Sequence, residues 1–161
     1  MSVSFKYQEA AADWLRARRR AYLADVPGLG KTREVILAAA TLAPTRILVC
    51  CPASALGRWE EESAGLSGVT LVSYEMALRH PHRLPAGRLD LLVCDEAHHL
   101  KSTHADRTRL VLGTEGLTRR TDRVWFLSGT PMPNHPGELF TILATAFPER
   151  LRALRITSYP I

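Results

Sequence analysis

The segment that most constrains the fold of this chain is Asp25-Val26-Pro27-Gly28-Leu29-Gly30-Lys31-Thr32, and Asp95-Glu96-Ala97-His98 follows further along. The glycines of the first segment let backbone N–H groups approach phosphate oxygens, Lys31 adds a positive charge, and the Thr32 hydroxyl can bind Mg²⁺. In the second segment, Asp95 can hold the same metal, and Glu96 can orient or deprotonate an attacking water. The two segments together predict a site for ATP and Mg²⁺.

Short apolar strands alternate with helical patterns along the chain. The apolar run 21–24 stops at the segment 25–32, called the phosphate loop below, and a helix follows over 31–42. This is the strand, loop, helix order of a P-loop unit. The apolar run 89–94 delivers Asp95 and Glu96 at its C-terminal end, where open α/β sheets bind ligands. The predicted strands are 21–24, 46–51, 69–72, 89–94 and 124–127, and the predicted helices are 7–20, 31–42, 57–62, 74–79, 105–112 and 137–147, with a loop over 80–88. This alternation predicts an α/β fold with a mostly parallel central sheet and helices on both faces.

The length and composition fit a single domain over residues 1–161. Of these residues 46% are hydrophobic and 23% charged, and no apolar run approaches the roughly 20 residues of a membrane-spanning helix. The N-terminus lacks the apolar core of a secretory signal. We therefore expect a cytoplasmic protein, with the nucleoid or nucleus as alternatives, and no membrane partner. The net charge of +5 is compatible with a nucleic-acid partner but does not require one.

Cys50, Cys51 and Cys94 lie in apolar runs without paired C-x-x-C spacing, which predicts buried packing residues rather than ligands or disulfides. The six histidines have no companion cysteines at zinc spacing. Mg²⁺ is the one metal that the sequence predicts.

Further segments narrow the class of ATP-binding protein. They are Phe5-Lys6-Tyr7-Gln8, residues 48–59 (Leu-Val-Cys-Cys-Pro-Ala-Ser-Ala-Leu-Gly-Arg-Trp), Val72-Ser73-Tyr74-Glu75, the pair Leu100-Lys101 that ends the segment 95–101, and residues 127–134 (Leu-Ser-Gly-Thr-Pro-Met-Pro-Asn) with Glu138-Leu139 after them. With these segments, the chain resembles the N-terminal RecA-like lobe of superfamily-two helicases. It is most similar to the Swi/Snf-type family of DNA-dependent ATPases and translocases, from Phe5 to about Phe147.

The resemblance implies a role for each segment. Gln8 would read the adenine edge with Tyr7 beside it, and the cofactor-binding residues would be Tyr7, Gln8, Asp25, Pro27, Gly28, Leu29, Gly30, Lys31 and Thr32. The catalytic set would be Lys31, Asp95, Glu96 and His98, with Thr32 and Asp95 as Mg²⁺ ligands and His98 as the link to the coupling segment 128–130. Phosphates of duplex DNA would be met by Pro52, Ala53, Ser54, Ser73, Tyr74, Ser128, Gly129 and Thr130.

The resembled family also has a second RecA-like lobe, which we expect to be absent from this chain. Phosphoryl transfer needs positive charge at the γ-phosphate, typically an arginine worth about 10³ to 10⁵ in rate. In the family those arginines belong to the second lobe. The isolated chain is therefore expected to bind ATP weakly and to hydrolyse it very slowly.

The phosphate loop, residues 25–32, departs from wider patterns in two ways. Asp25 stands where the broad P-loop pattern has glycine or alanine, and the Swi/Snf-type loop also begins with aspartate, which favours the narrower family. Val26-Pro27 replaces that family's usual acidic residue and methionine. Because proline removes one N–H from the loop, phosphate binding could be altered.

Several alternatives stay open at this stage. The arginines at 16, 18, 19 and 20 are expected to form a solvated helix end rather than a DNA contact, and Trp59 to pack rather than to wedge between bases. The alternative functions are a strand-separating DNA or RNA helicase lobe and a non-catalytic ATP-binding or DNA-binding module. An unrelated P-loop ATPase is disfavoured by the segment Ser128-Gly129-Thr130-Pro131.

Overall fold

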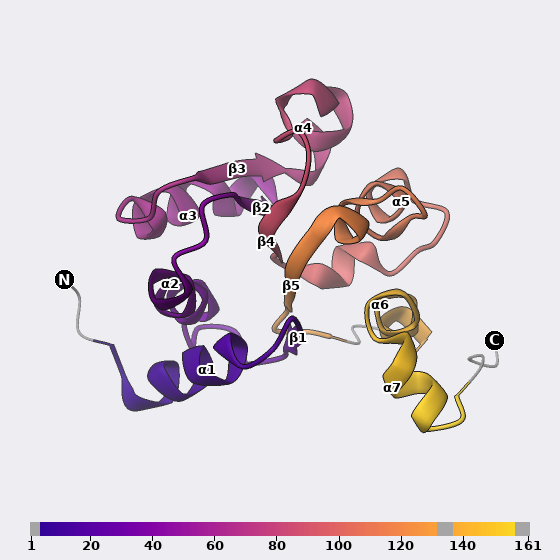
Figure 1. Cartoon of the computed structure of the whole chain (residues 1–161), viewed down its shortest axis with the longest axis horizontal. Helices are drawn as coiled ribbons and strands as arrows, with labels where there is room; N and C mark the ends of the chain where they lie inside the picture. Colours follow the sequence, from indigo (N-terminus) through magenta and orange to yellow (C-terminus); the bar gives the residue numbers. More distant parts are fainter. Residues whose placement is uncertain (1–3, 132–136, 157–161) are drawn as a thin grey trace.

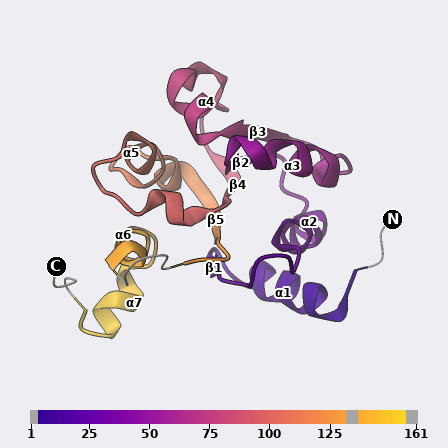
Figure 2. The ribbon, with the colours of Figure 1, turned by 180° about the vertical axis from the view of Figure 1, so that it is seen from behind.

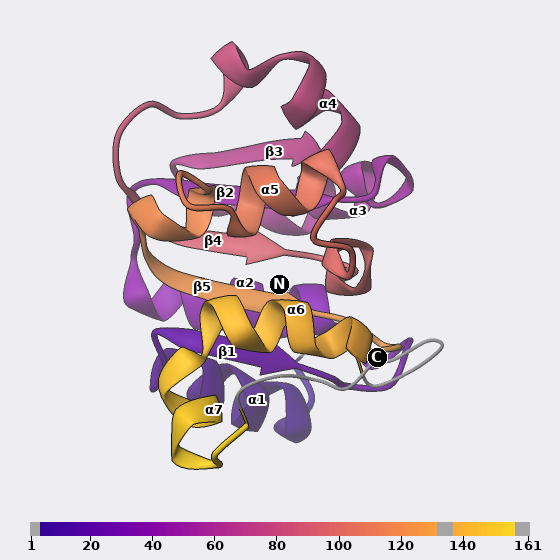
Figure 3. The same cartoon turned by 90° about the vertical axis from the view of Figure 1, so that its right-hand side faces the viewer.

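The computed structural model describes residues 4–131 and 137–156, and a five-stranded sheet runs through its centre. The strand order is β1-β5-β4-β2-β3, and every neighbouring pair is parallel. Figure 3 shows the strands running in one direction across the molecule. The strands are β1 (Arg20–Leu23), β2 (Ile47–Cys51), β3 (Val69–Ser73), β4 (Leu89–Cys94) and β5 (Thr121–Leu127).

Helices cover both faces of the sheet, as Figures 1 and 2 show from opposite sides. One face carries α1 (Lys6–Arg16), α2 (Lys31–Leu42) and α3 (Leu56–Ser63). The other carries α4 (Tyr74–Arg79), α5 (Asp106–Leu112) and α6 (Gly137–Ala146), and α7 (Pro148–Ala153) follows α6. Short 3₁₀ turns are η1 (Ala53–Ala55), η2 (Pro81–Arg83), η3 (Ala97–Leu100) and η4 (Leu117–Arg120). No helix in the described ranges is long and apolar enough to cross a bilayer.

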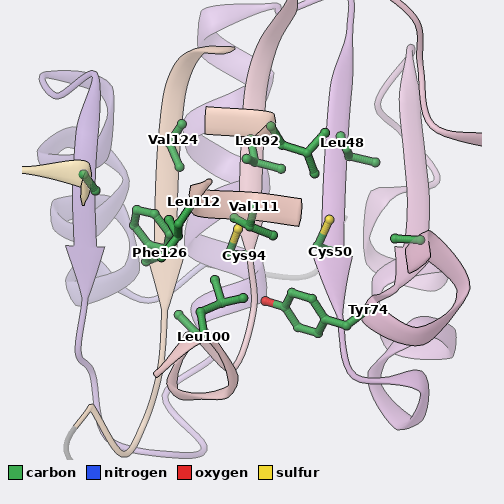
Figure 4. Close-up of a cluster of buried hydrophobic side chains, with 14 of the residues drawn as sticks. Leu48, Cys50, Tyr74, Leu92, Cys94, Leu100, Val111, Leu112, Val124 and Phe126 are labelled. Atoms are coloured by element: carbon green, nitrogen blue, oxygen red, sulfur yellow. The ribbon is translucent and has the colours of Figure 1, made fainter. Parts of the chain in front are cut away.

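Side chains of the central strands alternate between two hydrophobic clusters. Leu48 and Cys50 of β2 pack toward α4, α5 and α6, in the cluster drawn in Figure 4, whereas Val49 and Cys51 pack toward α1, α2 and α3. Both faces are covered, so these strands are continuous apolar runs rather than alternating ones. Cys50, Cys51 and Cys94 are free and buried, as expected, and burial raises the pKa of the Cys50 thiol to about 12.

The predicted fold class is confirmed: the sheet is parallel and helices lie on both of its faces. α2 has the predicted bounds, but the first helix ends at Arg16 rather than at residue 20. Arg20 instead opens β1, where it pairs with Val124 and its guanidinium donates to the backbone carbonyl of Thr118. Arg16 thus stands in the last turn of the helix, as expected, whereas Arg20 begins the strand, a division that a helical pattern alone does not reveal. α7 was also not predicted, although Pro148 at its first turn is a common helix start.

The parallel order brings the segments that follow the strands to one edge of the sheet. The phosphate loop follows β1, Ser128 follows β5, Asp95 follows β4, Pro52 follows β2, and Tyr74 follows β3. This carboxyl edge is where ligands bind in open parallel sheets. Asn134 lies outside the described residues.

Candidate nucleotide and metal site

The phosphate loop joins β1 to α2 in a conformation that depends on two glycines. Gly28 and Gly30 have φ angles of 92° and 86°, in the left-handed region that favours glycine. Gly30 is also the N-cap of α2. The first-turn amides of a helix have no intrahelical acceptor and carry the positive end of the helix dipole. The loop therefore presents an anion-binding helix start at the carboxyl edge.

Lys31 is bound to the loop itself. Its Nζ donates to the backbone carbonyl of Asp25 over 2.9 Å, and the neighbouring Thr32 is buried at 6% exposure. A phosphate oxygen is a stronger, charge-assisted acceptor for an ammonium group than a neutral carbonyl is. A nucleotide phosphate can therefore take the place of the Asp25 carbonyl.

Pro27 packs directly against the segment that follows β5. A Cβ atom placed on Gly129 would lie 2.6 Å from Cγ of Pro27 and 2.8 Å from its Cδ. The pyrrolidine ring thus fills the space that glycine leaves at position 129. Pro27, which replaces the methionine usual in the resembled family, thus makes a close contact between the phosphate loop and segment 128–130.

Gln8 and Tyr7 fasten α1 to the phosphate loop. The Gln8 side chain donates through Nε2 to the Leu29 carbonyl over 3.1 Å, and its Oε1 accepts from the Phe5 backbone N–H over 3.1 Å. The Tyr7 hydroxyl donates to the same Leu29 carbonyl over 3.1 Å. The rings of Phe5 and Tyr7 stack with centroids 5.6 Å apart and are exposed. Both ends of the Gln8 amide are therefore engaged with protein, beside an exposed aromatic pair.

Asp95 is held by donors from three directions. Its Oδ2 accepts from the Trp59 indole Nε1 over 2.9 Å, its Oδ1 accepts from the Glu96 backbone N–H over 2.9 Å, and its backbone carbonyl accepts from the Tyr74 hydroxyl over 2.9 Å. The side chain is 9% exposed. These contacts fix the carboxylate in one orientation, and each of its oxygens keeps a lone pair for another ligand.

Glu96 and His98 connect the ends of β4 and β5. Glu96 has a φ of 47°, a conformation that costs a non-glycine residue about 1–2 kcal/mol. His98 Nδ1 lies 3.2 Å from Glu96 Oε2 and 3.1 Å from Ser128 Oγ. Ser128 Oγ also accepts from the Thr130 backbone N–H over 3.2 Å. The position of the Glu96 carboxylate is thereby tied to the segment that follows β5.

A second connection lies beyond η3. Lys101 Nζ is 2.7 Å from Glu138 Oε1, and the Thr141 hydroxyl donates to the Lys101 backbone carbonyl over 2.7 Å. Glu138 is 8% exposed. This partly buried contact joins the end of the segment 95–101 to α6.

The residues predicted to meet DNA phosphates fall into two groups. Ala53, Ser54 and Thr130 are exposed, and Pro52 and Gly129 are half-buried. The other three are buried, with Ser73 and Tyr74 at 2% and Ser128 at 0% exposure. The Ser73 hydroxyl accepts from the Met76 N–H at the start of α4, and the Tyr74 hydroxyl donates to Asp95. These three hydroxyls therefore serve internal contacts and are not presented to a phosphate in this conformation.

The oxygen donors at this edge suit Mg²⁺. Mg²⁺ prefers one or two carboxylates together with water and phosphate oxygens, and Asp95, with the Thr32 hydroxyl as a further oxygen donor, would be the residues to hold it. The described residues hold no group of three or more His, Cys, Asp or Glu side chains that would favour another metal.

Sequence reasoning missed two residues of this region. Trp59 was assigned to packing only, yet its indole N–H is bound to Asp95. Glu34, in the first turn of α2, is completely buried, close to Asp25 of the phosphate loop. Burial, and then the negative charge of Asp25, raises the pKa of Glu34 to about 7. No sequence signal distinguishes Glu34 from an ordinary solvated carboxylate at a helix start.

Comparisons with known proteins agree on one family. The chain is 28% identical to DNA repair and recombination protein RAD54B of Gallus gallus over 187 residues, covering 94% of this chain and 20% of that protein. It is 27% identical to Helicase SWR1 of Saccharomyces cerevisiae, covering 89% and 12%, and 28% identical to a SWI/SNF-related matrix-associated actin-dependent regulator of chromatin subfamily A-like protein 1 of Drosophila melanogaster, covering 84% and 20%. The chain thus spans about a fifth or less of these relatives. The family model described as SNF2-related domain matches residues 62–157, and the chain belongs to that family.

Proposed function

We propose that this chain is the ATP-binding lobe of a DNA-dependent ATPase that couples ATP hydrolysis to movement along duplex DNA. The observation that carries the proposal is the row of contacts along the carboxyl edge, in which the phosphate loop touches Gly129 and His98 joins Glu96 to Ser128. Relatives named for DNA repair and recombination, for helicase activity and for chromatin regulation support a DNA-associated role.

In the proposed mechanism, ATP lies on the loop and the start of α2. Exposed Phe5 and Tyr7 offer an aromatic surface for adenine beside Gln8, and Lys31 exchanges the Asp25 carbonyl for a phosphate oxygen. Thr32 and Asp95 would hold Mg²⁺, which when bound neutralises charge on the β- and γ-phosphates. Glu96 orients or deprotonates the attacking water.

The coupling step is assigned to His98. A change in the position of Glu96 during hydrolysis alters its contact with His98 Nδ1, and the same nitrogen contacts Ser128 Oγ. Thr130, exposed and bonded to Ser128, then transmits the change to DNA phosphates bound at this edge. The contact of Lys101 with Glu138 extends the same connection to α6.

A second lobe is proposed to supply the arginines that stabilise charge at the γ-phosphate. Such an arginine contributes a factor of about 10³ to 10⁵ to the rate. The chain alone should therefore hydrolyse ATP more slowly than a two-lobed version by a factor of this order. The test compares the ATPase rate of this chain with that of a longer version carrying a second lobe, with and without duplex DNA. Rapid turnover by the chain alone, or stimulation by RNA in place of duplex DNA, would refute the assignment.

The nucleotide site is tested separately by calorimetry with ATP and Mg²⁺. Lys31→Ala should abolish detectable binding, because it removes the loop's positive charge. Arg119→Ala is a suitable control, since Arg119 is exposed in η4 at the opposite edge of the sheet. Unchanged binding in the Lys31 variant would exclude the loop as the phosphate site.

A further inference from the structure

Trp59 combines two properties that packing alone does not require. It is completely buried in the cluster between the sheet and α1, α2 and α3. Its indole N–H points to the carboxylate of Asp95 and donates to Oδ2 over 2.9 Å. Phenylalanine or leucine could fill an apolar space of this kind without burying a polar group, which is unfavourable unless a partner is present. The partner here is the carboxylate proposed to hold Mg²⁺.

The hydrogen bond fixes the one side-chain oxygen of Asp95 that the backbone does not. Oδ1 is already held by the Glu96 N–H, and Tyr74 holds the backbone carbonyl. Without the indole N–H, rotation about the terminal bond of Asp95 is restrained through Oδ1 alone. The orientation of Oδ2 therefore depends on Trp59.

Trp59 also ties Asp95 to a different part of the carboxyl edge. It lies on the first turns of α3, which follows β2 through Pro52 and the 3₁₀ turn η1. Ala53 and Ser54 in that turn are exposed and belong to the proposed DNA contact. The segment 52–54 is therefore joined through α3 to the donor that holds Asp95.

We propose that Trp59 is a positioning residue for the metal-binding carboxylate of Asp95 and links the segment 52–54 to the Mg²⁺ site. The inference rests on the proposed function, because it requires Asp95 to hold Mg²⁺. Its specific content is that the indole N–H sets the affinity for the metal, while the ring accounts for packing.

The first test is Trp59→Phe, which keeps an aromatic ring and removes the N–H. The matched control is Trp125→Phe, because Trp125 is equally buried but donates its indole N–H to the Arg18 carbonyl, near the start of β1. Binding of a fluorescent ATP analogue is titrated with Mg²⁺, and its affinity is also measured in EDTA. Circular dichroism checks that each variant is folded.

Loss of a group that orients a metal ligand typically lowers metal affinity 10- to 100-fold. We expect about a tenfold rise in the Mg²⁺ concentration for half-maximal binding in Trp59→Phe, because Oδ1 stays bound to the Glu96 amide. The affinity in EDTA should stay unchanged, and Trp125→Phe should match the unmodified chain in both measurements. Equal Mg²⁺ midpoints for the two variants, or an equal loss with and without Mg²⁺, would overturn the inference.

A second measurement uses the unmodified chain and so does not depend on the stability of the Trp59 variant. The three tryptophans give three indole N–H resonances, which Trp14→Phe and Trp125→Phe assign by elimination. Addition of Mg²⁺ to the chain saturated with ATP should shift the Trp59 resonance more than the other two. A Trp59 resonance that does not move on Mg²⁺ binding would contradict the proposed role.

The two proposals fail in different ways. If the unmodified chain shows no Mg²⁺-dependent ATP binding, the proposed function fails and the inference fails with it. A different result refutes only the role of Trp59. In that case the unmodified chain binds ATP in a Mg²⁺-dependent way, Lys31→Ala abolishes binding, and Trp59→Phe has the same Mg²⁺ midpoint as the unmodified chain.

Discussion

Replacing Glu34 with glutamine is expected to change how the stability of the domain depends on pH. Burial, and then the negative charge of Asp25, raises the pKa of Glu34 from its ordinary 4.5 to about 7. Between these values the unfolded chain has lost the proton and the folded chain still holds it. The free energy of unfolding therefore falls as pH rises through this window and levels off above about pH 7.

The size of this effect follows from the two pKa values. At 1.36 kcal/mol per pH unit, the interval from 4.5 to about 7 corresponds to roughly 3 kcal/mol of lost stability. Glu34→Gln has no ionisable group and lacks this loss. A buried amide with an unsatisfied polar atom costs roughly 1–3 kcal/mol, and this cost is the same at every pH. The test therefore follows how the gap in unfolding free energy between Glu34→Gln and the unmodified chain changes with pH. The size of that gap at a single pH does not isolate the ionisation of Glu34.

Urea unfolding followed by circular dichroism at intervals from pH 4.5 to 8 measures both curves. The stability of Glu34→Gln relative to the unmodified chain should rise by roughly 3 kcal/mol across this range. Glu61→Gln changes an exposed glutamate of α3 and should run parallel to the unmodified chain. Parallel curves for Glu34→Gln as well would show that Glu34 is ionised in the folded chain and would refute the reasoning.

Three further changes test other contacts. Gly129→Ala should weaken ATP binding several-fold in calorimetry, because its Cβ would lie 2.6 Å from Pro27 Cγ; Gly57→Ala, where a Cβ meets nothing within 4 Å, should not. In a version with two lobes, His98→Ala should lower duplex-stimulated ATPase more than the unstimulated rate, because it removes the contacts of His98 with Glu96 and Ser128. Asp90→Ala should lower the free energy of unfolding in urea by roughly 1–3 kcal/mol, since the Asp90 carboxylate accepts from two backbone N–H groups and the Thr45 hydroxyl. The control Asp13→Ala removes only a surface ion pair and should cost less than about 1 kcal/mol.

Local patterns were sufficient to predict the elements that carry strong local signals. The left-handed Gly30 and the apolar spacing after it fix the start and length of α2, which has the predicted bounds. The strand ahead of Asp95 was equally well defined, because β4 is buried on both faces and its sequence is a continuous apolar run. In both cases the residues that determine the element are contained in it.

Contacts between distant segments could not be predicted in the same way. Trp59 and Asp95 are 36 positions apart, and only the order of β2, β4 and β3 brings α3 over the end of β4. Glu34 is charged and stands in the first turn of a helix, where solvated carboxylates are common. Its burial depends on α1 and α3 packing against α2, which no pattern within α2 records.

The strand order also determines which couplings are available to the proposed motor. β5 lies between β1 and β4, so segment 128–130 touches the phosphate loop through Pro27 on one side and His98 on the other. On the far side of β4, β2 leads to α3 and the Trp59 donor to Asp95. A change at the phosphates or at segment 52–54 therefore needs to pass through only one neighbouring segment to reach Glu96 or Asp95. A sheet with β5 at its outer edge would separate the phosphate loop from segment 128–130, and the same motifs would then lose this direct connection.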